Sequence, residues 1–482
     1  MNIDVKHKTK IGVFWNFIEK FFLQIVSFVL NIILARLLSP EDYGVIGLLT
    51  IFITISQVFV DSGFSRALIQ KQNKEEIDFS TTFIFNISTS VILYVILYFA
   101  SPFIAKFYET PELVNLQRVL FLVIIFNSFF VVQNAKLQIK IDFKSIAIVN
   151  SISTILSGGC AIFFAYRGFG PWALVIQTLS KSIFSSLLYW IIGKWVPKTF
   201  FSFTSFKQLF SFGSKLLFSG LLSTSIGSLY RLIIGKIYST EKLGFYTRAV
   251  QFPDIVSGTI TSVLNTVTFP LMSSLQDSSE DLISTFRRII KITSMFVFPA
   301  MVGLSMLSEP IILVLLGEKW AFAAELLFWL CFAEIFSTHN GLNMNLLNAI
   351  GRSDLFLKVD LVKYPFMFLT MAITFPISLK AVVIGRAIVA FVYFYINTYM
   401  IGKLYKYGAL KQLLDSWKYI ISTIIMAIIV KIVDFLIVSN IYSLFSGIIV
   451  GGVTYMLCLY ILKDSEFYIL ITKIKGKIKC KK

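Results

Sequence analysis

The sequence predicts an all-α integral membrane protein with about fourteen transmembrane helices, and three observations lead to this fold class. Apolar residues fill 56% of the 482 positions and charged residues only 15%, with a mean hydropathy of +0.79, which excludes a soluble domain of this length. Apolar runs long enough to cross a bilayer recur along nearly the whole chain. One short polar segment occurs twice, which divides the helices into two halves.

The hydrophobic runs place each helix, and short polar breaks separate them. The predicted spans are 11–36, 43–62, 81–101, 113–133, 144–166, 171–191, 213–238, 245–272, 287–307, 323–348, 358–379, 380–401, 416–437 and 441–462. Lys and Arg concentrate at both termini and in the loops that follow even-numbered helices. By the positive-inside rule both termini are expected in the cytoplasm, and this bias explains most of the net charge of +18.

The repeated segment is ARLLSPEDYG at 35–44 and GKIYSTEKLG at 235–244, aligned without a gap. The two copies share three residues, Ser39/Ser239, Glu41/Glu241 and Gly44/Gly244. Both are predicted to be outer hairpins that start their halves on the same side of the membrane, so the halves are parallel repeats. The predicted organisation is a six-helix lobe in 1–198, a linker in 199–212, a six-helix lobe in 213–402, and two extra helices with a basic cytoplasmic tail in 403–482.

The linker 199–212 carries Phe203, Phe206, Leu209 and Phe210 on one side at helical spacing. This pattern indicates an amphipathic helix lying along the cytoplasmic interface, and it fits the beginning of the seventh helix equally well.

Metal and cofactor chemistry have no candidate residues. The four cysteines and two histidines are scattered through the chain without ligand spacing, so no cofactor and no metal site are expected. The basic tail KIKGKIKCKK is suited to anionic lipid headgroups. Because the positive charge follows the topology, nucleic acid is not expected as a partner.

Charged residues inside predicted spans are the candidate site. An intramembrane cation costs roughly 2.5 to 3.5 kcal/mol at a helix centre, so its presence suggests a function. The candidate substrate-binding cations are Lys20, Arg118, Lys181, Arg231 and Arg248, while Arg386 and Lys431 can snorkel. The carboxylates Glu19, Asp61, Asp254 and Glu334 are candidates either for binding a coupling ion or for pairing with these cations. Because basic residues recur in both halves, a cationic cavity that attracts an anion such as phosphate is the favoured interpretation.

Several segments resemble a known family. They are ILARLLSPEDYGVIGLLTIF, DSGFSRALIQ and RGFGPWALV in the first half, and VTFPLMSSLQDSSEDL and ILVLLGEKWAFAAELL in the second. In order and content they resemble the Wzx-type polysaccharide/O-antigen (lipid-linked oligosaccharide) flippases of the multidrug/oligosaccharidyl-lipid/polysaccharide exporter superfamily.

The resemblance implies two six-helix lobes around a central, often cationic, cavity in a bacterial cytoplasmic (inner) membrane. It implies a transporter that turns an undecaprenyl-diphosphate-linked repeat unit toward the outer leaflet by alternating access, for lipopolysaccharide or exopolysaccharide biosynthesis. The expected ligands are membrane lipids and the polyprenyl-diphosphate-linked oligosaccharide, and the protein partners to consider are a polysaccharide polymerase and glycosyltransferases.

Two other transporters stay as alternatives. A drug/cation antiporter of the same superfamily would use embedded carboxylates, here Asp61, Asp254 and Glu334, and a peptidoglycan-precursor flippase is hard to distinguish by sequence. An enzyme is not expected, because the longest predicted outer loops, near 308–322, are too short to hold catalytic groups.

Overall fold

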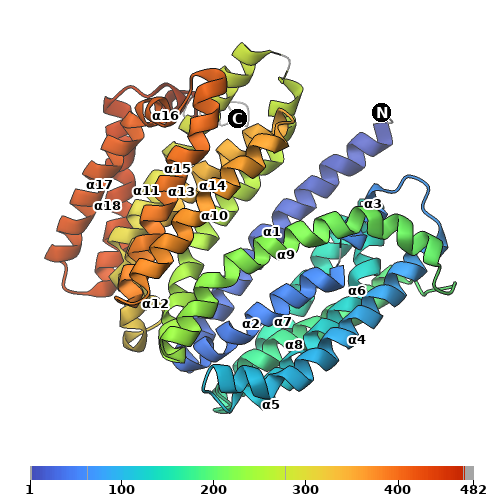
Figure 1. Cartoon of the computed structure of the whole chain (residues 1–482). Coiled ribbons are helices and arrows are strands. Elements are labelled where there is room, and N and C mark those ends of the chain that lie inside the picture. Colours follow the sequence, from blue (N-terminus) through green and yellow to red (C-terminus); the bar gives the residue numbers. More distant parts are fainter. Residues whose placement is uncertain (1–2, 62, 277, 471, 473–482) are drawn as a thin grey trace, which may run out of the picture. The chain divides into compact units, whose positions relative to one another are not determined.

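The structure, a computed structural model, describes residues 3–61, 63–276, 278–470 and 472. In these ranges the chain forms helices joined by short turns, with no strand, which confirms the predicted all-α class (Figure 1). The chain divides into two compact units, Met1–Thr247 and Arg248–Lys482. The tail after residue 472, predicted to be cytoplasmic, lies outside the described residues.

The first unit holds the helices from α1 to α9 and the beginning of α10. They are α1 (Ile3–Leu37), α2 (Pro40–Asp61), α3 (Phe64–Gln70), α4 (Glu76–Phe107), α5 (Leu113–Leu120), α6 (Leu122–Ile139), α7 (Phe143–Tyr166), α8 (Trp172–Gly193), α9 (Phe203–Ile237) and α10 (Thr240–Ser274). The predicted fourth span is interrupted at Phe121, where α5 gives way to α6.

The repeated polar segments end one helix and begin the next. Ser39 caps α2: its hydroxyl accepts from the backbone N–H of Asp42 at 3.2 Å, and the Asp42 carboxylate accepts from the Ser39 N–H at 2.8 Å. Ser239 caps α10 in the same way, accepting from the N–H of Lys242 at 3.2 Å. The shared acidic residues, Glu41 and Glu241, lie in the first turns of α2 and α10. The positive end of each helix dipole favours a negative charge there.

Helix α9 includes most of the predicted linker. It begins at Phe203, capped by the Ser202 hydroxyl, and continues without a break to Ile237. The stretch 203–212 is therefore continuous with the helix predicted at 213–238. This arrangement corresponds to the interpretation of the stretch as the beginning of the seventh helix. Helix α9 packs along α2 (Figure 1) and belongs to the first unit. The division into two six-helix lobes, the second starting at 213, stays a prediction.

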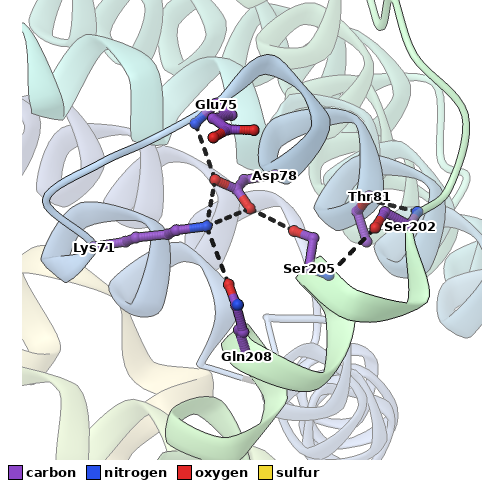
Figure 2. Close-up of polar contacts among 7 residues, drawn as sticks. All are labelled: Lys71, Glu75, Asp78, Thr81, Ser202, Ser205 and Gln208. Carbon is purple, nitrogen blue, oxygen red and sulfur yellow. Dashed lines mark hydrogen bonds and ion pairs between the residues drawn. The ribbon is translucent and has the colours of Figure 1, made fainter.

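A polar cluster fastens the beginning of α9 to the beginning of α4 (Figure 2). Asp78, fully buried, accepts from the Lys71 ammonium at 2.7 and 2.8 Å, from the Glu75 N–H at 3.0 Å and from the Ser205 hydroxyl. Lys71 also donates to Gln208 at 3.4 Å. Because Ser205 and Gln208 belong to α9, this network holds the start of that helix in place.

The second unit continues with helices from the rest of α10 to α18. They are α11 (Ser279–Met306), α12 (Ser308–Leu315), the 3-10 turn η1 (Glu318–Trp320), α13 (Ala321–Ala349), α14 (Ser353–Thr374), α15 (Leu379–Tyr405), α16 (Ala409–Asp415), α17 (Trp417–Leu436) and α18 (Asn440–Ile461). Helices α11, α13 and α15 form its centre, with buried residues such as Phe286, Leu346, Leu347 and Ile401.

A bidentate ion pair joins α11 to α16 in this unit. The Arg287 guanidinium donates to both oxygens of Asp415 at 2.8 Å, and the Tyr407 hydroxyl donates to Asp415 at 2.9 Å. Partial burial raises the pKa of the Asp415 carboxyl, but the hydrogen bonds from Arg287 and Tyr407 outweigh it and bring this pKa below its usual value. Burial raises the pKa of the Tyr407 hydroxyl, with Asp415 adding to the rise.

Twelve helical stretches of the described residues are long and apolar enough to cross a membrane. The predicted eighth and eleventh spans also form helices, α10 and α14, of 35 and 22 residues, but these two are not among the twelve. Both carry charges: Arg248 and Asp254 in α10, and Asp354, Lys358, Asp360 and Lys363 in α14. The chain is a multi-pass membrane protein, and the number fourteen remains a prediction.

Candidate transport site

The five candidate cations lie on five different helices. In the first unit they are Lys20 on α1, Arg118 on α5, Lys181 on α8 and Arg231 on α9, and in the second unit Arg248 on α10. That they line one cavity remains a prediction.

Arg118 is held by its own surroundings. Its Nε donates to the Ser101 hydroxyl at 3.3 Å, and its guanidinium lies 4.2 Å from the centroid of the Tyr98 ring. Both partners belong to α4. Arg118 therefore joins α5 to α4 while remaining half-buried, and part of its role is structural.

Lys181 and Arg231 are the clearest candidates for binding an anion. Each lies in a helical stretch apolar enough to cross a membrane, and the described part of the chain gives neither an ion-pair partner. Lys181 is nine residues from the first residue of α8, about 13 Å along the helix axis. The Lys181 side chain is exposed and that of Arg231 half-buried. A charge at this depth is costly unless it meets water or an anion.

The other two cations differ in their exposure. Lys20 is exposed on α1. Arg248 is 4% exposed, and its guanidinium donates to the side chain of Gln251 one turn later on α10. Burying a guanidinium requires such hydrogen bonds, because an isolated buried charge is unfavourable.

Neighbouring side chains engage the candidate carboxylates Glu19, Asp61 and Glu334. Buried Glu19 accepts from the Asn150 amide of α7 at 2.6 Å, and Asp61 accepts from the Ser65 hydroxyl at 2.6 Å. Glu334 pairs with Arg386 of α15 at 3.4 Å. The fourth, Asp254, has an exposed side chain on α10 and also interacts with its surroundings.

Two cavities in the second unit were not predicted from the sequence. One, of about 700 Å³, lies among α11, α12, α17 and α18, with a nearly wholly apolar lining that includes Met295, Pro299, Met426, Gly447 and Gly451. This lining suits a hydrocarbon chain and offers little to a phosphate. The glycine spacing 447 to 451 is the small-xxx-small pattern of close helix contacts, a signal that points to this place in the sequence.

The second cavity, of about 680 Å³, is lined by both polar and apolar residues. It lies at the end of α11 and the beginnings of α13 and α15. It contains Glu309, Glu318, the pair Glu325 and Lys380, and the ring of Trp329. Its charges of both signs suit a polar ligand.

The long apolar helices define an all-α, multi-pass membrane protein. A family model described as "Polysaccharide biosynthesis protein" matches residues 33–325, more than half of the chain. The chain therefore belongs to this family of polysaccharide biosynthesis proteins, and the resemblance to the polysaccharide flippases of the exporter superfamily is confirmed.

Individual relatives agree with the family. The teichuronic acid biosynthesis protein TuaB of Bacillus subtilis (strain 168) is 28% identical over 346 residues, 71% of this chain and 72% of that protein. The lipopolysaccharide biosynthesis protein WzxC of Escherichia coli (strain K12) is 22% identical, covering 76% of this chain and 75% of that protein. A solved structure titled "Lipid II flippase MurJ, inward closed conformation" aligns with a TM-score of 0.76 and 18% identity, over 93% of this chain and 98% of that one, which shows a common fold.

Proposed function

We propose that this protein flips an undecaprenyl-diphosphate-linked oligosaccharide repeat unit across the cytoplasmic membrane for surface polysaccharide biosynthesis. Both termini would lie in the cytoplasm, and the two halves would rock between inward-open and outward-open states. Membership of the polysaccharide biosynthesis family supports the substrate class.

The observation that carries the proposal is the pair of membrane-embedded cations without an ion-pair partner in the described part of the chain, Lys181 and Arg231. A diphosphate carries several negative charges, and a guanidinium binds phosphate oxygens in a bidentate manner. Such contacts offset the loss of hydration when the diphosphate leaves the aqueous interface. The lipid tail would remain in the bilayer and pass between helices.

The carboxylates give less support to the drug/cation antiporter. Glu334 already pairs with Arg386, and Asp61 accepts a hydrogen bond from Ser65. A carboxylate that serves as a structural partner is less available to bind a transported cation.

The test replaces Lys181 and Arg231 by Ala, singly and together, in a strain that depends on this protein for polysaccharide export. Charged hydrogen bonds are worth about 1.5 to 3 kcal/mol each, so each single variant should lower export about ten-fold or more. Arg352→Ala is the control, because Arg352 pairs with Asp354 at an exposed helix start. Normal export by the double variant, at normal protein level in the membrane, would contradict the cationic site.

A further inference from the structure

The two copies of the repeated segment lie against each other in the first unit. A Cβ placed on Gly44 would fall 1.7 Å from the carbonyl oxygen of Thr240, and one placed on Gly244 would fall 1.8 Å from the carbonyl oxygen of Pro40. No side chain fits at such distances, so the backbones of α2 and α10 touch directly. Glycine at both positions is a steric requirement.

The contact is reciprocal. The offset of 200 that aligns the two segments maps Pro40 onto Thr240 and Gly44 onto Gly244, so each copy presents the same patch to the other. About one turn further along α2, Gly47 lies beside Thr247, its equivalent at the same offset. A Cβ added at position 47 would lie 3.1 Å from the Thr247 Oγ1. A self-complementary contact of this kind is what a local two-fold relation between repeats produces.

Leucine side chains fill the space beside the glycines. A Cβ at Gly235 would meet the Leu48 side chain at 2.2 Å, and the Leu243 side chain contacts both Gly47 and Gly235. Leu48 and Leu243 are fully buried. We call this contact, formed by Pro40, Gly44, Gly47, Leu48, Gly235, Thr240, Leu243, Gly244 and Thr247, the glycine seam.

The chemistry of the glycine seam permits repeated opening. Its contacts are van der Waals packing and close approaches of glycine Cα atoms to carbonyl oxygens, each individually weak. Small residues allow helices to approach closely inside a membrane without fixing them by charge. Packed interfaces of this type have discrete closed and open arrangements.

We propose that the glycine seam closes the transport path at the beginnings of α2 and α10, and that it must part for the glycan to leave. This inference rests on the proposed function, because it assigns the seam to one end of that path. The distribution of Lys and Arg predicts that this end faces the outside of the cell. The repeated segment thus supplies one matching surface from each half of the sequence.

The first test locks the seam with a disulfide. In a chain whose four native cysteines are replaced by Ser, Gly47→Cys and Thr247→Cys are combined, because the Thr247 Oγ1 marks where a Cys sulfur would lie, close to the Cβ of position 47. Diamide should form the bond, and export should fall at least ten-fold and recover with dithiothreitol. Each single Cys variant, treated with diamide, is the control and should export normally. Failure of the bond to form, or normal export by the fully oxidised protein, would overturn the proposal.

The second test does not depend on the substrate. A single reporter, Thr224→Cys on α9, is labelled from outside intact cells with a membrane-impermeant maleimide. Gly44→Leu should wedge the seam apart and raise the labelling rate several-fold. Gly159→Leu on α7, where a Cβ added to the glycine would have no atom within 4 Å, should not. Equal labelling rates in Gly44→Leu and its parent would overturn the proposal that the glycine seam closes the path. If Gly44→Leu does not fold, the disulfide test alone decides whether the proposal holds.

The two proposals can fail separately. If Gly44→Leu raises the labelling of Thr224→Cys as expected but deletion of the protein leaves polysaccharide export normal, the glycine seam stands and the proposed substrate is wrong. If deletion abolishes export and the oxidised double-Cys protein restores it, the substrate class stands and the seam is wrong.

Discussion

The buried carboxylate of Asp78 should be worth several hydrogen bonds to the first unit, and Asp78→Asn tests this directly (Figure 2). The substitution keeps the size of the side chain but removes its charge. It leaves the Lys71 ammonium facing a neutral amide, and one of the two carboxylate oxygens becomes an NH₂ group that cannot accept from Lys71, Glu75 or Ser205.

The magnitude follows from burial. Breaking a fully buried ion pair costs about 3 to 5 kcal/mol. Asp78 is fully buried, but the Lys71 side chain is 27% exposed and regains water, so we expect about 2 to 3 kcal/mol, nearer the value of a charged hydrogen bond. For a unit of 247 residues, each kcal/mol lowers the unfolding midpoint by about 2 to 4 °C, which predicts a decrease of about 5 to 10 °C.

The assay is thermal unfolding of the purified protein in detergent, followed by loss of the monodisperse peak. Asp354→Asn is the matched control: Asp354 forms an ion pair of similar length with Arg352, at 2.8 Å, but on an exposed surface, where such pairs contribute little. Lys71→Met combined with Asp78→Asn should recover part of the loss, because the unpaired cation is gone. Equal midpoints for wild type, Asp78→Asn and Asp354→Asn would refute the reasoning.

Two further predictions concern carboxylates elsewhere. Glu19→Gln keeps a side-chain oxygen that accepts from Asn150, so we expect export by this variant to stay within about two-fold of wild type. Loss of export at a normal level of the protein would instead assign Glu19 to ion coupling. Asp415→Asn should destabilise the second unit by a constant amount between pH 8 and about pH 5. Because the Asp415 pKa is depressed in the folded state, its contribution is present above the usual carboxyl pKa and is lost as the pH falls through the folded pKa. The difference between wild type and variant should therefore shrink below about pH 4, and unfolding in detergent across this range measures it.

Hydrophobic patterning predicted the helical architecture because the bilayer demands long apolar stretches. The predicted span 323–348 corresponds to α13 at Ala321–Ala349, and 441–462 to α18 at Asn440–Ile461. The course of the chain through 199–212 could not be predicted, because an interfacial helix and the first turns of a membrane helix share one amphipathic pattern. The hydrogen bonds from Ser205 and Lys71 that anchor α9 connect residues far apart in the sequence.

The candidate site was predictable only in part. Sequence identifies charges within apolar spans but not their neighbours, so it could not show that Arg118 rests on Tyr98 and Ser101 while Lys181 has no carboxylate partner in the described chain. The repeated segment shows a related limit. The offset of 200 established that Gly44 and Gly244 are equivalent, but equivalence under a repeat does not require contact, and only the structure brings them together.

The leaflet in which the lipid-linked glycan resides tests the flippase proposal. Cells lacking this protein, and cells complemented with it, would be converted to spheroplasts and exposed to a glycosidase or lectin that cannot cross the membrane. We predict that the deletion strain accumulates lipid-linked repeat units that are inaccessible from outside, and that complementation by the wild type, but not by the Lys181→Ala and Arg231→Ala double variant, makes them accessible. Lipid-linked glycan equally accessible with and without the protein would contradict transport by this chain.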